Sequence, residues 1–138
     1  MNTKLNFSQS IKAGAFTAIA AAAINSILFF VFHALAVFTD DIFLQPDQPL
    51  TVVPVLISSI VPTLIASMVF FIIEKYSNNG FGIFKIVSIV LLVLSFLNPF
   101  MGIKGVTVPY ALGLNLMHIT IVLFLLYFIG KAKKANQA

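Results

Sequence analysis

Long apolar stretches alternate with short polar links along this chain. Four stretches contain no Arg, Lys, Asp or Glu, and they cover residues 13–39, 48–73, 86–103 and 105–130. A bilayer core about 30 Å thick needs roughly 20 predominantly apolar residues in each helix that crosses it. Each stretch is long enough for one crossing, so the pattern predicts four membrane-spanning helices.

The links between these stretches are short and contain turn-forming residues. Residues 77–80 read Ser-Asn-Asn-Gly, and residues 98–107 include one proline and two glycines. Short links force each helix to run antiparallel to the one before it. The sequence therefore predicts an all-α fold, a four-helix transmembrane bundle with up-down-up-down topology. We expect one domain over residues 1–138, with helices at approximately 13–38, 50–73, 82–98 and 108–130.

The lysines predict the orientation of this bundle. In the predicted topology only Lys104 lies on one side, and the other side holds Lys4, Lys12, Lys75, Lys85, Lys131, Lys133 and Lys134. Loops on the cytoplasmic side of a membrane carry the excess of positive charge. Both termini are therefore expected to be cytoplasmic. Tyr110 at the outer boundary, and Tyr76 and Tyr127 at the inner one, fit an interfacial aromatic belt.

Composition narrows the classes of function. The chain is 60% hydrophobic and 9% charged, and its net charge is +4. All eight basic residues are lysine, so the planar fork by which Arg recognises phosphates and carboxylates is absent. We expect the lipid bilayer as a partner and no nucleic acid. There is no cysteine, which excludes disulfides, thiolate metal sites and thiol catalysis.

Small residues recur at three- and four-residue spacing in the first two predicted helices. This pattern lets helix backbones approach closely in lipid, so we interpret it as packing. The residues are Gly14, Ala18, Ala21, Ala22 and Asn25 in the first helix, and Ser59, Pro62, Thr63, Ala66 and Ser67 in the second. Pro62 removes one backbone hydrogen bond mid-helix, and we expect neighbouring hydroxyls to compensate.

Polar side chains that lipid makes costly gather at one predicted depth. A rise of about 1.5 Å per residue places Asn25, Asn115 and His118 within the middle third of the bilayer, with Ser58, Ser59 and Pro62 at similar depth. Such residues mark functional sites by default, although interhelical packing is the alternative interpretation. The candidate ligand-binding residues of this polar layer are Asn25, Ser58, Ser59, Pro62, Thr63, Asn115 and His118.

Other chemistries find little support in the sequence. His33 and His118 could form a bis-histidine haem pair or a metal site, but they differ in predicted depth. There is no phosphate-binding glycine loop, serine elbow or HExxH motif. An enzyme would need to work with histidine, asparagine and hydroxyl groups alone. We therefore expect a non-enzymatic protein without a cofactor.

Four segments carry a resemblance to known proteins. They are Asn25–Phe30, Leu50–Pro54, Ile60–Ala66 and Asn115–His118. In these segments the chain resembles an uncharacterised family of small four-helix integral membrane proteins from Bacteroidetes-type bacteria. The resemblance implies a multi-pass protein of the bacterial inner membrane, and it implies no activity and no site residues.

Two hypotheses of function remain open at this point, with a third less supported. The first is a non-enzymatic protein that binds or passes a small apolar or amphipathic ligand at the polar layer. The second is a structural or accessory subunit that recruits a membrane partner, with the polar residues joining the helices. The third is a haem-binding redox protein. A homo-oligomer is compatible with each of them.

Overall fold

The computed structural model describes residues 4–138; residues 1–3, which the predicted domain includes, lie outside the described part. The described chain forms α1 (Phe7–Ala34), α2 (Val52–Tyr76), α3 (Gly80–Ser95), α4 (Asn98–Gly102) and α5 (Val108–Gln137). Within it, four segments are long and apolar enough to cross a membrane, namely α1, α2, α5 and Gly80–Gly102, which joins α3 and α4. The predicted four-helix, all-α bundle is confirmed.

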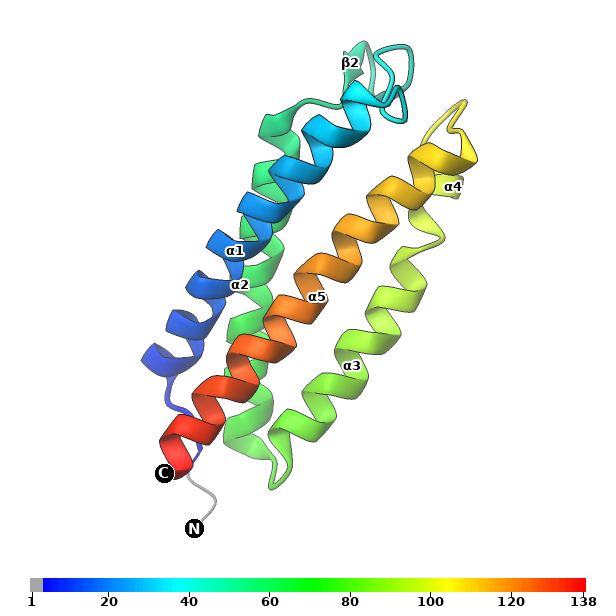
Figure 1. Cartoon of the computed structure of the whole chain (residues 1–138). Helices are drawn as coiled ribbons and strands as arrows, with labels where there is room; N and C mark the ends of the chain where they lie inside the picture. The colour runs from blue at the N-terminus through cyan, green and yellow to red at the C-terminus, as the bar shows by residue number, and fades with distance from the viewer. Residues whose placement is uncertain (1–3) are drawn as a thin grey trace.

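The helices lie side by side along one long axis, with the start of α1 and the end of α5 at the same end of the bundle (Figure 1). α1 packs mainly against α2 and α5, whereas α3 packs on α2 and α5 and makes fewer contacts. Successive long helices run in opposite directions, as the short links require. The end that holds the termini also holds the link between α2 and α3, so it is the lysine-rich end.

α1 begins earlier in the sequence than predicted, at Phe7, because a capping box starts it there. The Asn6 Oδ1 atom accepts a hydrogen bond from the Gln9 backbone N–H, and the Gln9 side chain accepts one from the Asn6 backbone N–H, both at 2.9 Å. α5 likewise continues beyond its charge-free stretch to Gln137. Helical structure therefore extends past the expected membrane boundary at the lysine-rich end.

α1 also ends earlier than predicted, at Ala34, in a left-handed cap. Ala36 has φ of 54°. The Val37 N–H donates to the Phe32 carbonyl at 2.8 Å, and the Ala36 N–H donates to the His33 carbonyl at 3.1 Å. This is the hydrogen-bond pattern of a Schellman motif. It turns the chain into a link with a short antiparallel hairpin of β1 (Phe43–Gln45) and β2 (Gln48–Pro49), which the sequence pattern did not predict.

The apolar core consists of two clusters along the bundle. The cluster near the β1–β2 hairpin includes Phe29, Phe38 and Tyr110, and the cluster near the termini includes Phe70 and Ile129. Tyr110 is fully buried and packs edge to face on Phe38, with ring centroids 4.9 Å apart. Its expected place in an exposed aromatic belt is therefore wrong, whereas Tyr76 and Tyr127 are exposed.

Candidate functional site

Asn25 links three helices in the interior of the bundle. Its side chain is 1% exposed. The Nδ2 atom donates to Ser59 Oγ of α2 at 3.0 Å and to the Met117 carbonyl of α5 at 3.3 Å. Both donors of this amide are engaged in helix–helix hydrogen bonds, which stabilise association in lipid. The Oδ1 atom has no hydrogen-bond partner within residues 4–138.

The hydroxyl groups of Ser58 and Thr63 donate to the backbone of their own helix, α2. Thr63 Oγ1 donates to the Ser59 carbonyl at 2.6 Å, and Ser58 Oγ donates to the Val55 carbonyl at 3.2 Å. Ser59 and Thr63 are buried, whereas Ser58 and Pro62 are exposed on the outer face of α2. The structure therefore groups Ser59 and Thr63 with Asn25, and it places Ser58 and Pro62 away from them.

The polar residues of α5 face a different helix. Asn115 Nδ2 donates to the Phe96 carbonyl at the end of α3 at 3.3 Å. His118 Nδ1 lies 3.5 Å from Ser95 Oγ of α3. These two side chains share a face of α5, as predicted, but that face packs on α3. The predicted layer is thus divided between an α1–α2–α5 contact and an α3–α5 contact.

The two histidines have separate environments. The His33 Nε2 atom, in the last turn of α1, lies 3.3 Å from Asp40 Oδ1 of the α1–α2 link, and both side chains are exposed, at 47% and 73%. His118 is half-buried against α3. This arrangement gives no support to a bis-histidine haem pair. Within the described part of the chain, no group of three or more His, Asp or Glu side chains could hold a metal ion.

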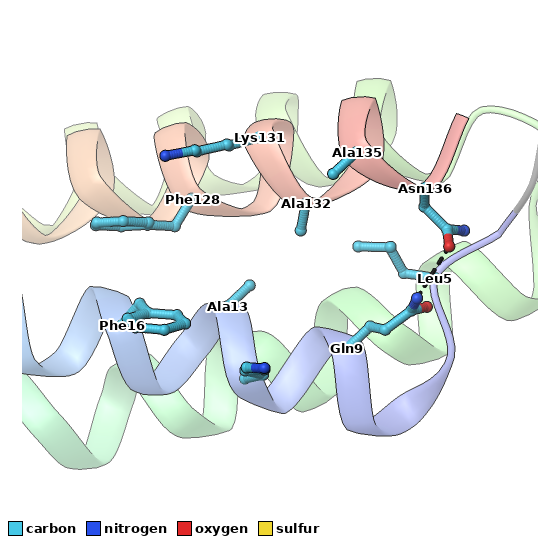
Figure 2. Close-up of a pocket in the computed structure, with 10 residues that line it drawn as sticks. Leu5, Gln9, Ala13, Phe16, Phe128, Lys131, Ala132, Ala135 and Asn136 are labelled. Carbon is cyan, nitrogen blue, oxygen red and sulfur yellow. Dashed lines mark hydrogen bonds between the residues drawn. The ribbon is translucent and has the colours of Figure 1, made fainter. Parts of the chain in front are cut away.

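A groove lies between α1 and α5 at the end of the bundle that holds the termini (Figure 2). Its volume is about 390 Å³. Leu5 and the first turns of α1 line one wall, and the last turns of α5 line the other. The rings of Phe16 and Phe128 stack at the end toward the membrane centre, with centroids 6.1 Å apart. At the opposite end Gln9 Nε2 donates to Asn136 Oδ1 at 2.9 Å.

Lysines occupy the same groove between these two ends. Lys12 lines it from α1 and Lys131 from α5, and both are exposed. Figure 2 shows the Lys131 side chain extending along α5 toward Phe128. Each lysine is the first charged residue outside the charge-free stretch of its helix. The groove therefore crosses the expected boundary between apolar lipid and water.

A buried ion pair lies at the same end of the bundle as the groove. Glu74 at the end of α2 is buried, and its Oε1 atom accepts a hydrogen bond from Lys133 Nζ at 2.7 Å. Lys4 Nζ donates to the Lys75 carbonyl at 3.0 Å and ties the start of the chain to α2. Glu74, Lys133 and Lys4 line a second, smaller cavity of about 250 Å³.

Sequence reasoning did not identify the groove or the ion pair. The available signal for the groove was Lys12 and Lys131, which end charge-free stretches on helices that meet at one end of the bundle. The signal for the ion pair was weaker. Glu74 is the only glutamate, but its partner lies 59 residues away, and seven lysines share that end.

Comparison with known proteins gives a family without an assigned function. No curated protein and no solved structure matches the chain. The family match covers residues 6–134, which includes the first three candidate membrane-spanning segments and all but the last three residues of the fourth. On that evidence the chain belongs to DUF6069, a family of unknown function.

Proposed function

We propose that this protein is a non-enzymatic, multi-pass protein of the bacterial inner membrane that binds an amphipathic ligand in the groove between α1 and α5. The groove itself carries the proposal. Its volume of about 390 Å³ falls in the range of small-molecule sites, which is roughly 300–1,000 Å³. Its walls are mostly apolar; the polar groups are the Gln9 and Asn136 side chains at one end, and Lys12 and Lys131 between the two ends.

The mid-membrane residues have a different role in this proposal. Asn25 and Ser59 use their hydrogen bonds to join helices, and Asn115 and His118 contact α3. We assign them to helix association and the groove to ligand binding. From the positive-inside rule we expect the groove on the cytoplasmic side, together with both termini.

Photolabelling tests this function directly. The protein is reconstituted in nanodiscs with a fatty acid that carries a diazirine in its chain, and labelled residues are mapped by mass spectrometry. We expect labels on Phe16 and Phe128. Ala135→Trp fills the groove from its exposed edge and should reduce these labels, whereas Leu123→Trp, on the lipid-facing side of α5, should not. Labels spread evenly over the exposed apolar surface, and unchanged by Ala135→Trp, would contradict the proposal.

A further inference from the structure

The two lysines of the groove have no acidic partner within residues 4–138. Of the four acidic residues in the sequence, three lie in the link between α1 and α2 at the opposite end of the bundle, and Glu74 pairs with Lys133. Lys12 and Lys131 thus place two uncompensated positive charges on opposite walls of one groove. Two such charges favour an anionic group in this part of the groove.

Along the groove the side chains change from polar to charged to apolar, which is the order of the parts of a phospholipid molecule. The Gln9–Asn136 hydrogen bond lies at the end toward water, the lysines lie at the membrane boundary, and Phe16 and Phe128 lie toward the bilayer centre. A phospholipid presents a polar head, a phosphate and an acyl chain in the same order. Basic pockets between membrane-spanning helices bind anionic head groups in this way.

We infer that the occupant of the groove is an anionic phospholipid of the cytoplasmic leaflet, with its phosphate at the level of Lys12 and Lys131 and one acyl chain against Phe16 and Phe128. This inference rests on the proposed function and names its ligand. A lysine stem can lie along apolar surface while its ammonium group reaches the polar interface, as amphipathic side chains do. The rest of the lipid stays in the surrounding bilayer.

The test compares head-group charge at constant chain chemistry. Phosphatidylcholine nanodiscs receive a trace of either phosphatidylglycerol or phosphatidylcholine with the same diazirine-labelled chain. Two lysines near an anionic head group favour it by about tenfold or more in total, so labelling of Phe16 and Phe128 should be greater with phosphatidylglycerol by that factor. Lys12→Gln with Lys131→Gln should remove the difference, and Lys12→Arg with Lys131→Arg should keep it.

A matched control separates this site from general attraction to the surface. Lys85→Gln with Lys134→Gln removes two exposed lysines at the same end of the bundle, outside the groove, and should leave the preference unchanged. Equal labelling by the two lipids in the wild type would overturn the inference and leave the proposed function standing. An equal loss in the control variant would also overturn it. The proposed function is tested by a different result: if Ala135→Trp leaves fatty-acid labelling of the groove unchanged, the groove does not bind the ligand.

Discussion

The Lys133 ammonium group lies 2.7 Å from the Glu74 carboxylate and joins the ends of α5 and α2. The two side chains differ in their access to water, since Lys133 is 15% exposed and Glu74 only 2%. The other carboxylate oxygen, Glu74 Oε2, has no hydrogen-bond partner among the described residues. The buried carboxylate therefore depends on Lys133 for its stabilisation.

This asymmetry predicts unequal effects of removing each partner. Lys133→Met leaves a buried carboxylate without compensation and should lower the free energy of unfolding by about 3–5 kcal/mol. Glu74→Gln should cost less, because the Lys133 ammonium can reach water. Reversible unfolding in mixed detergent micelles measures both values. The variant with both Lys133→Met and Glu74→Gln should be more stable than Lys133→Met alone. If the double variant is as unstable as Lys133→Met, the loss does not come from an uncompensated Glu74 carboxylate.

Close contact between α1 and α2 at Gly14 gives a second prediction. A Cβ atom on Gly14 would lie 2.5 Å from the Cβ atom of Ser67, closer than such atoms can approach. Gly14→Ala should therefore push the helices apart and lower the free energy of unfolding by about 1–3 kcal/mol. Unfolding in detergent micelles measures the change. Adding Ser67→Gly removes the obstructing atom and should restore part of the loss.

Gly102→Ala is the matched control for this experiment. A Cβ atom at Gly102 meets only the Asn98 side chain, at 3.3 Å, so its effect on stability should be small. A loss at Gly102 as large as the loss at Gly14 would show that the general cost of replacing glycine, rather than helix contact, explains the result.

The hydrogen bond between Asn25 and Ser59 should contribute measurably to stability. A double-mutant cycle of Asn25→Ala and Ser59→Ala should give a coupling energy of about 0.6 kcal/mol, and no more than roughly 1.7, because polar contacts between helices in lipid are of this size. Ser58→Ala is the control, since Ser58 lies on the outer face and bonds only to its own helix. A coupling energy of zero would show that the Asn25–Ser59 hydrogen bond does not stabilise the contact between α1 and α2.

The bundle could be predicted from the sequence because charged residues and small residues have restricted positions in a membrane protein. Lysines and aspartates mark where helices leave the apolar region, and Gly14 and Ser67 were both in predicted packing stripes. Large apolar residues carry much less information, because in a bilayer they suit a lipid-facing surface as well as the interior. The sequence therefore did not show that Asn115 and His118 face α3 or that Tyr110 is buried.

The groove could not be predicted for a related reason. It is formed by helix ends that continue beyond the charge-free stretches, and the start of α1 depends on the local capping box at Asn6 and Gln9. The distance of 59 residues between Glu74 and Lys133 likewise hides their contact until the bundle is assembled.

The lysine distribution predicts the orientation of the bundle, and single cysteines can test that prediction. The chain has no cysteine, so an introduced one is the sole thiol. Gln45 lies in the hairpin link and Asn78 in the α2–α3 link, and both are exposed. A membrane-impermeant maleimide applied to intact spheroplasts should label Gln45→Cys and not Asn78→Cys, because seven of eight lysines lie on the Asn78 side. After lysis both should react. Labelling of Asn78→Cys in intact spheroplasts would reverse the orientation and place the groove in the outer leaflet.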